Sequence, residues 1–320
     1  MKKTTLLLFL LIGILSCKND ENQEQEIHKI PLELKVERFD QLFGQATADN
    51  LPKLQKDYPF MFSKKYSDSF WLAKTKDTLQ IKLLQEVAKV FPDIQEQESE
   101  IKSLFQHIKF YFPEFMSPRV ITATSFVDYR NRIIVTDTIT LISIDTYLGS
   151  DHEFYQGIQK YIRQDFNKDH IVVDLASEYA KKYIFQGQNK TLLDEMIYFG
   201  KQLYFEDKVI PFKTEAERIG YTEAQLEWAR ANESYIWRYF VERELLFSTD
   251  SKLPGRFINP APFSKFYLEE IDSQSPGRLG QYMGWQIVRA YMENNEVTLK
   301  DMLLASPEDI FNNSKFKPRK

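Results

Sequence analysis

Few residues in this sequence have the types and spacing that metal or nucleophilic chemistry needs. No two of its four histidines stand four residues apart, the spacing that places two imidazoles on one face of a helix for a metal ion. We therefore expect no metal and no other cofactor. The histidines are His28, His107, His152 and His170.

The densest cluster of titratable side chains is Asp151-His152-Glu153. A carboxylate beside an imidazole can tune it as a general base. The same residues better suit an exposed helix start, where the helix dipole favours acidic side chains. The phosphate-binding loops G-x-G-x-x-G and G-x-x-x-x-G-K-[ST] are absent from the sequence, as is the G-x-S-x-G nucleophile elbow.

The single cysteine, Cys17, stands in the most specific pattern of the chain. A basic start is followed by an apolar run from Leu6 to Leu15, which is typical of a signal peptide and shorter than the roughly 20 residues of a membrane-spanning helix. The run ends in Ile14-Leu15-Ser16-Cys17, which resembles the bacterial lipobox. We predict that residues 1–16 are a signal peptide and that acylated Cys17 anchors the chain in a lipid bilayer. The alternative is an accidental cysteine in an uncleaved anchor.

Residues 17–30 are predicted to be a solvated polar tether. Lys18 to Glu26 includes four acidic side chains and no apolar one. The segment also resembles the Lys-plus-acidic export signals of Bacteroidetes surface lipoproteins, which leaves surface display open. We expect a lipid-anchored protein of the cell envelope, in the outer membrane and facing the periplasm.

Composition favours a packed protein over a disordered or polytopic membrane one. The 320 residues are 43% hydrophobic and 14% aromatic, and aromatic rings bring the most apolar area per residue to a core. The 42 basic and 46 acidic residues give a net charge of -4, which argues against nucleic-acid binding. Because no linker is visible after residue 30, residues 31–320 are predicted to be a single globular domain.

Apolar periodicity predicts a mainly helical α+β fold. The segment from Ile27 to Phe39 alternates like a strand that enters the domain. Asp174 and Thr191 are predicted N-caps, and Gly220 is expected to interrupt a long helical segment before Thr222 restarts it. The predicted helices are 79–90, 98–112, 154–166, 172–185, 192–205, 215–246 and 279–294, followed by two short ones.

A small sheet is predicted in the middle of the chain, near residues 119–146. Three segments there are rich in Ile, Val and Thr, namely Arg119–Val127, Arg132–Thr136 and Thr140–Thr146. The intervals between them are too short for crossover helices, so we expect the strands to be antiparallel.

Two patterns near the C-terminus concern contacts of helices. Gly280-x-x-x-Gly284 would let a second helix approach closely, and we expect that helix to belong to the same fold. The aromatic-rich segment around Tyr235, Trp237, Tyr239 and Phe240 could present a binding face, but core packing is the preferred interpretation.

Three stretches resemble the gliding motility lipoprotein B (GldB) family of the Bacteroidetes. They are Val36-Glu37-Arg38-Phe39-Asp40, which follows the lipobox and tether, Leu141 to Gly149 (LISIDTYLG) and Pro276 to Trp285 (PGRLGQYMGW). The resemblance implies a lipid-anchored envelope protein required for gliding, the movement of adhesins along the cell surface, in a machinery tied to the type IX secretion system. The family has no established enzymatic activity, and relatives in bacteria that do not glide leave a broader envelope role open.

A weaker resemblance is to predicted zinc peptidases with an H-E-x-x-H motif, which leaves a zincin-like core open. In that register Glu178 stands at the general base, while Ser177 and Lys181 replace the two histidine ligands. Glu195 falls on the next helix, where those enzymes place a third ligand. Without two imidazoles zinc has no coordination shell, so the resemblance implies a peptidase fold that has lost its chemistry. The alternative is that Glu178 and Lys181 form an ordinary i, i+3 ion pair on an exposed helix face.

Two Asp-Thr-apolar patterns resemble sites at which Bacteroidetes O-glycosylate periplasmic proteins. They are Asp77-Thr78-Leu79 and Asp137-Thr138-Ile139, and both threonines stand at predicted turns or helix starts, where exposure is expected. Thr78 and Thr138 are therefore candidate O-glycosylation sites.

The leading functional hypothesis is an envelope lipoprotein that is not an enzyme and works by contacts with gliding and type IX secretion proteins. The alternative is a hydrolase of peptidase-like fold that uses carboxylates near Glu178 and Glu195. A hydrolase should have a charged pocket with perturbed pKa values, whereas a contact protein should expose an aromatic patch. A third class, a ligand-binding lipoprotein that feeds a transporter, would need a cleft between two lobes.

Overall fold

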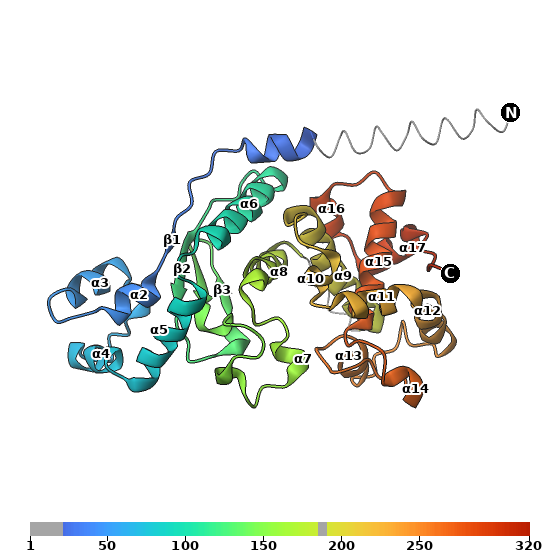
Figure 1. Cartoon of the computed structure of the whole chain (residues 1–320). Coiled ribbons are helices and arrows are strands. Elements are labelled where there is room, and N and C mark those ends of the chain that lie inside the picture. Colours follow the sequence, from blue (N-terminus) through green and yellow to red (C-terminus); the bar gives the residue numbers. More distant parts are fainter. Residues whose placement is uncertain (1–21, 185–190) are drawn as a thin grey trace.

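The computed structural model describes residues 22–184 and 191–320. A small sheet separates helices α2–α5 from the larger group of helices that follows it in the chain (Figure 1). The strands are β1 (Val36–Glu37), β2 (Arg119–Ala123), β3 (Ile133–Val135) and β4 (Ile139–Ser143). The helices are α2 (Phe39–Gly44), α3 (Leu51–Asp57), α4 (Asp68–Thr75), α5 (Thr78–Val90), α6 (Gln95–Tyr111), α7 (Lys160–Arg163), α8 (Ile171–Tyr183), α9 (Leu192–Val209), α10 (Glu215–Ile219), α11 (Glu223–Ala231), α12 (Glu233–Glu242), α13 (Leu253–Phe257), α14 (Glu269–Asp272), α15 (Leu279–Asn294), α16 (Leu299–Leu304) and α17 (Pro307–Ser314).

The α+β class and the small central sheet are confirmed, but the all-antiparallel arrangement is wrong. The strand order is β1-β2-β4-β3, in which β2 pairs with both β1 and β4 in parallel and only β3 and β4 are antiparallel. After β2 the chain passes the end of β4 and returns along its outer edge as β3, where Ile133 pairs with Ile142. Strand β3 therefore forms the connection between the parallel strands β2 and β4, where a crossover helix is usual. For this reason the short intervals between the predicted strands did not exclude a parallel pair.

Each face of the sheet is covered by its own core. Val120 and Ile142 join the main core, which also holds the inner faces of α6, α8, α9 and α15. Ile121 of β2 points the other way, because side chains alternate along a strand. Ile121 belongs to a satellite core beneath α2 and α3, together with Phe39, Leu51, Leu54, Tyr58 and Phe62.

Most of the predicted helices are confirmed. Helices α5, α6, α8, α9 and α15 begin and end close to their expected positions, and two short helices, α16 and α17, follow α15. Thr191 and Thr222 cap α9 and α11 in reciprocal capping boxes, each accepting a hydrogen bond from the backbone three residues on. Gly220 adopts the left-handed conformation (φ 65°) that ends α10. None of the described helices is long and apolar enough to cross a membrane.

Two details of the helix prediction are wrong. Residues 154–166 form only short turns, including α7, because the chain folds back near Gly157 (φ 92°). The rings of Tyr155 and Phe166 consequently lie 5.0 Å apart, whereas a continuous helix would separate these positions by about 16 Å. Asp174 is not an N-cap, because α8 begins at Ile171. Its carboxylate instead accepts hydrogen bonds from Arg132 (3.0 Å) and from the hydroxyl of Tyr147 (2.7 Å).

Residues 22–30 of the predicted solvated tether dock on the fold, and of the predicted entering strand only Val36–Glu37 pairs, as β1. Residues 22–28 are helical, and we call residues 22–30 the N-terminal strap. Ile27 is completely buried, although polar residues surround it in the sequence. The Nε2 group of Gln106 on α6 donates to the carbonyl oxygens of His28 (3.2 Å) and Ile30 (2.9 Å). Extended pairing begins only at Val36, in β1.

Helices α9 and α15 approach each other more closely than side chains normally allow. A Cβ atom on Gly284 would lie 1.8 Å from the backbone oxygen of Met196, and one on Gly200 would lie 2.4 Å from the backbone of Gly284. The expected close approach within the fold is therefore confirmed at Gly284. Gly280, one turn earlier, faces α13 and the adjoining Ile258 instead.

We expect Gly284→Ala to lower the free energy of unfolding by about 3 kcal/mol or more, because the new methyl group meets backbone that no side-chain rotation can move. Urea unfolding followed by circular dichroism measures the change.

Gly255→Ala is the matched control, because a Cβ atom at that position in α13 meets nothing within 4 Å. It should change the free energy of unfolding by less than about 0.5 kcal/mol. Equal stabilities of the two variants would contradict the close approach of α9 and α15.

Candidate functional site

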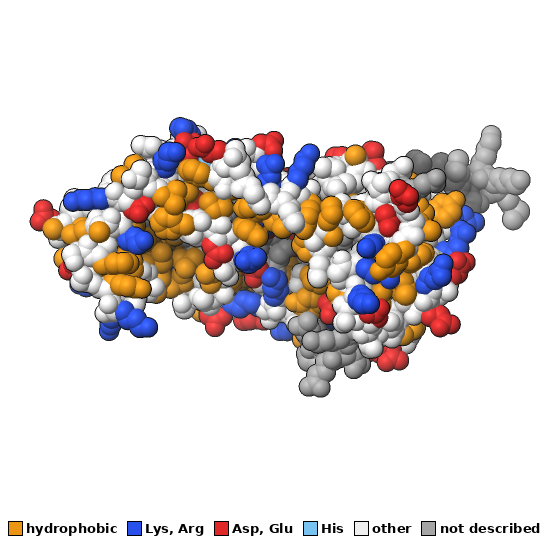
Figure 2. Space-filling model, turned by 90° about the horizontal axis from the view of Figure 1, so that it is seen from below, with side chains coloured by type: hydrophobic (Ala, Val, Ile, Leu, Met, Phe, Trp, Pro, Cys, Tyr) orange, Lys and Arg blue, Asp and Glu red, His pale blue; other side chains and the backbone are white. Residues whose placement is uncertain are grey.

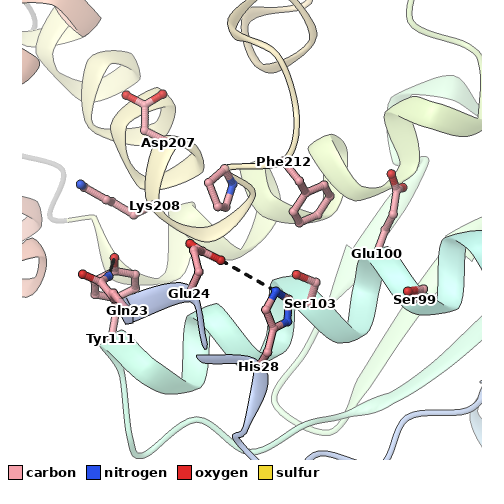
Figure 3. A pocket seen from close by; sticks show the side chains of 11 residues that line it. Gln23, Glu24, His28, Ser99, Glu100, Ser103, Tyr111, Asp207, Lys208 and Phe212 are labelled. Atoms are coloured by element: carbon pink, nitrogen blue, oxygen red, sulfur yellow. Dashed lines mark hydrogen bonds and ion pairs between the residues drawn. The ribbon is translucent and has the colours of Figure 1, made fainter. Parts of the chain in front are cut away.

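A cavity lies where the N-terminal strap crosses between α6 and the end of α9. Its volume is about 700 Å³, and its lining combines charged, hydroxyl and aromatic side chains. Figure 3 shows Glu24 and His28 of the strap within it, with the Glu24 carboxylate directed at His28 at 4.0 Å. The lining residues are Gln23, Glu24, His28, Ser99, Glu100, Ser103, Tyr111, Asp207, Lys208, Pro211 and Phe212.

A buried histidine holds the strap at this cavity. His107 of α6 is 1% exposed, and its Nδ1 lies 2.8 Å from the carbonyl oxygen of Ser103. Its Nε2 lies 3.2 Å and 3.3 Å from the two carboxylate oxygens of Glu24. Both ring nitrogens therefore lie within hydrogen-bond distance of an oxygen atom, one on α6 and one on the strap. Gln23 adds a bond of 2.6 Å from its Nε2 to the hydroxyl of Tyr111.

The same helix, α6, contributes an ion-paired carboxylate to the cavity wall, two turns before His107. Glu100 lies 2.6 Å from the ammonium group of Lys213, which is itself buried. Burial raises the pKa of the Glu100 carboxyl, and Lys213 opposes this effect. The carboxylate is thus already occupied by a partner from its own chain.

Asp207 belongs to a cluster of charges that join α9, α10 and α15, which we call the Asp207 cluster. Its two carboxylate oxygens accept hydrogen bonds from Arg289 (2.8 Å each), and one of them also accepts from the indole of Trp285 (2.9 Å). The Nε of Arg218 lies 3.2 Å away, and Arg289 reaches on to Glu215 at 3.0 Å. Burial works against the charge of Arg289, but Asp207 and Glu215 hold its pKa above the ordinary value.

Glu206, next to Asp207, has the most unusual environment of the carboxyls. It is 1% exposed, and burial raises its pKa to about 8. Its Oε1 accepts a hydrogen bond of 2.5 Å from the hydroxyl of Ser177 on α8, while its Oε2 has no partner among the described residues. A neutral carboxyl at this place avoids most of the cost of a buried charge.

The structure does not assemble the four degenerate peptidase positions into one site. Glu178 and Lys181 form an i, i+3 ion pair of 2.5 Å on a substantially exposed face of α8, as the simpler interpretation of the sequence predicts. Glu195 lies in the first turn of α9. Ser177 turns inward and meets α9 at Glu206 rather than at Glu195. Within the described residues, no three His, Cys, Asp or Glu side chains are grouped as a metal site would require.

The remaining candidates are surface features or lie outside the described residues. Thr78 begins α5 and Thr138 lies in the turn before β4, and both are exposed, so their O-glycosylation stays a prediction. His152 caps a short turn by accepting a hydrogen bond from the backbone of Phe154, in agreement with the simpler interpretation of its cluster. Cys17 lies outside the described part of the chain.

Sequence reasoning missed Glu206, the Asp207 cluster and His107. A signal for Glu206 exists, because it stands three residues after Leu203 and three before Val209, on the apolar stripe of α9. An acid on such a stripe is either paired or neutral. The contact of His107 with Glu24 and those of Asp207 with Trp285 and Arg289, by contrast, join residues at least 78 positions apart in the chain, and nothing local predicts them.

The chain is thus a mainly helical α+β protein with a cavity that is lined in part by its own N-terminal strap. The family model for gliding motility protein GldB matches residues 20–318, and the chain therefore belongs to the GldB family. The family resemblance of the sequence is thereby confirmed. No curated protein and no solved structure matches the chain.

We expect His107→Gln to loosen the strap, because it removes the charge-assisted bond to Glu24. Since Glu24 is partly exposed, a loss of roughly 1 kcal/mol is expected, which corresponds to about fivefold faster amide exchange in residues 22–30. Hydrogen–deuterium exchange with mass spectrometry measures it.

Glu24→Gln should give the same result, and Glu26→Gln is the matched control. Glu26 lies on the same helical segment, but its side chain is exposed. Unchanged exchange in the Glu24→Gln variant would show that the pair does not hold the strap.

Glu206 should make the protein less stable as the pH rises. The pKa of Glu206 is about 8 in the folded chain, above the ordinary 4.5, so the folded state binds a proton that the unfolded state releases. The stability contributed by the neutral form is full below about pH 4.5 and is lost progressively up to about pH 8. Glu206→Gln removes this dependence, and its stability relative to the wild type should rise by about 3–4 kcal/mol at most between pH 5 and pH 8.

Urea unfolding of both proteins across this pH range provides the measurement. Glu195→Gln, which replaces a partly exposed carboxyl on the same helix, controls for the change of charge. If the Glu206→Gln and Glu195→Gln variants follow the same pH profile, Glu206 is not held neutral by the fold.

Proposed function

We propose that this GldB-family chain is a lipid-anchored envelope protein that works by contact with gliding and type IX secretion proteins and has no catalysis of its own. The family supports the role in gliding. The lipobox at Cys17 supports anchoring to the outer membrane, with the folded part in the periplasm. The net charge of -4 supports a protein partner over a nucleic acid.

Anchoring at Cys17 determines which side of the fold faces away from the bilayer. Four residues lie between Cys17 and the start of the strap at residue 22, and the five residue-to-residue steps span at most about 17 Å. The strap would therefore lie near the membrane surface. Helices α13 and α14 lie on the opposite side of the molecule from the strap (Figure 1). That opposite side is free to meet partners in the periplasm.

The single observation that carries the proposal is an exposed aromatic surface on this distal side. Tyr235 is 64% exposed and lines a groove of about 390 Å³ between α12 and residues 266–271. Tyr267, which is 62% exposed, stands in the chain between the lining residues Phe266 and Leu268. Arg238 lies 5.2 Å from the ring of Tyr235, and Arg256 lies 4.6 Å from that of Tyr267. Figure 2 views this side, where apolar side chains gather with Lys and Arg among them.

Surfaces of this composition are typical of protein contacts, because Tyr and Arg dominate the binding energy of interfaces. Of the aromatic segment predicted to pack in the core, Phe240 is buried there, whereas Tyr235 is exposed.

We call Tyr235, Phe263, Tyr267, Leu268 and Ile271 the distal patch; all of them are exposed.

No observation favours the hydrolase alternative over the contact role. Glu178 is paired with Lys181 on the surface, and Asp207 is held by Arg289. Glu206, whose pKa is raised to about 8 by burial, is sealed between α8 and α9 rather than presented to a substrate.

We expect the double variant Tyr235→Ser with Tyr267→Ser to lose its partners and to abolish gliding. In cells that carry the tagged variant in place of the native gene, crosslinked gliding and type IX secretion components should fall about tenfold or more, because each ring removed is a candidate hot spot. In the wild type, crosslinked peptides from these components should map to the distal patch.

Met116→Ser is the matched control, because Met116 is 80% exposed and lies outside the distal patch. Both proteins should melt at the same temperature. Recovery of the same components from the double variant and from the wild type would overturn the proposed contact surface.

A further inference from the structure

A second, smaller cavity lies on the satellite side of the sheet, away from both the strap and the distal patch. It has a volume of about 290 Å³ and lies between α2, α4 and the end of β2. Aromatic rings form most of its wall: Phe39, Phe43, Phe62, Tyr66, Phe70, Trp71 and Phe126. Concave apolar sites with a few convergent polar groups are typical of small-molecule binding.

The rings that form this wall hold one another in place. Phe62 and Trp71 pack edge to face at 5.1 Å, and Phe70 packs on Trp71 in the same way at 5.2 Å. Tyr66 stacks on Phe70 at 4.1 Å. The cavity is therefore preformed, and a ligand need not order its walls.

A strained loop brings Phe126 to the cavity. Phe126 and Val127 both have positive φ angles, 56° and 61°, which are unfavourable for side chains of these types. The fully buried carboxylate of Asp145 holds the loop by accepting hydrogen bonds from the backbone of Ser125 (2.9 Å) and Val127 (2.8 Å). Backbone strain of this kind persists only where the surroundings enforce it, and it occurs frequently at ligand clamps.

The charges in the wall are not balanced. Lys74 of α4 is partly buried, its Nζ lies 5.7 Å from the ring centroids of both Phe70 and Phe126, and it has no ion-pair partner among the described residues. Asp40, the acid in the wall, is already held by Arg38 at 2.8 Å and by the hydroxyl of Thr122 at 2.5 Å. The unneutralised charge in this described cavity is therefore positive.

The neutral polar groups lie in the same wall and satisfy each other. The Nε2 group of Gln80 donates to the hydroxyl of Thr124 at 2.9 Å, and that hydroxyl lies 3.2 Å from the Oε1 of Gln80. An amide and a hydroxyl can exchange this mutual bond for bonds to an anion.

We propose that this cavity binds a medium-chain fatty acid, with the alkyl chain among the aromatic rings and the carboxylate at Lys74. A methylene group takes about the volume of a water molecule, about 30 Å³ in a liquid, so the cavity accommodates an alkyl chain of about ten carbons. A quaternary ammonium ligand, which aromatic cages also attract, is disfavoured because Lys74 would repel it.

Decanoate is the probe, titrated into the whole mature chain with Cys17→Ser so that neither an acyl group nor detergent competes. Isothermal titration calorimetry should show one site per chain with a Kd on the order of 10–100 µM. The fluorescence of Trp71, in the cavity wall, should change with the same midpoint. No saturable binding at millimolar decanoate would overturn the proposal.

Two comparisons test the role of the charge. Lys74→Met should weaken decanoate binding tenfold or more, whereas Lys76→Met, at an exposed lysine just after α4, should leave it unchanged. Decylamine, with the same chain and the opposite charge, should bind at least tenfold more weakly than decanoate. Equal binding to the two lysine variants, or tighter binding of decylamine, would overturn the assignment of the carboxylate to Lys74.

Discussion

The close contact between α9 and α15 is the constraint on which the rest of the structure depends. With Gly284 against the backbone of Met196, the two helices are near enough for Asp207 to reach Trp285 and Arg289 at hydrogen-bond distance. A wider spacing would leave Asp207 and its partner buried without each other, and an unpaired buried charge costs several kcal/mol. Helix α9 also holds the C-terminal helices in place. The buried ammonium group of Lys201 on α9 donates to the carbonyl oxygens of Leu303 and Ala305, at the end of α16. Burial lowers the pKa of Lys201 to about 8.

The sequence predicts what short-range physics controls. The capping threonines, the break at Gly220 and the apolar stripes of the long helices each follow from residues within a few positions of one another, and the structure has them as expected. The direction of β2 relative to β4 depends on where β3 returns, and the collapse of residues 154–166 depends on a contact between Tyr155 and Phe166. Local periodicity carries no information about either, because both are decided by packing across the fold.

The charged groups of this chain show why residue type alone is a weak guide to a site. Glu178 matches a catalytic position by register, yet on the folded chain it is one half of an exposed ion pair. Glu206 matches no motif, yet burial, the largest cause, raises its pKa to about 8. Burial and pairing, which decide how an acid behaves, are properties of the assembled helices. The four degenerate peptidase positions therefore lie apart. Glu178 and Lys181 form a pair on the surface, Glu195 lies at the start of α9, and the hydroxyl of Ser177 points into the interior.

In a lipid-anchored chain, the strap would also set the distance between the folded domain and the bilayer. Residues 22–30 are folded down onto α6, so in a chain anchored at Cys17, as proposed, the body of the molecule would be held close to the bilayer. The hydrogen bonds of Gln23, Glu24 and Gln106 all join the strap to α6. A force applied at the N-terminal end of the strap would therefore act on these bonds before it acts on the sheet. If they open, nine residues become free chain, worth at most about 30 Å of added reach. The strap would thus select between two distances of the folded domain from the membrane, a short one when it is docked and a longer one when it is released.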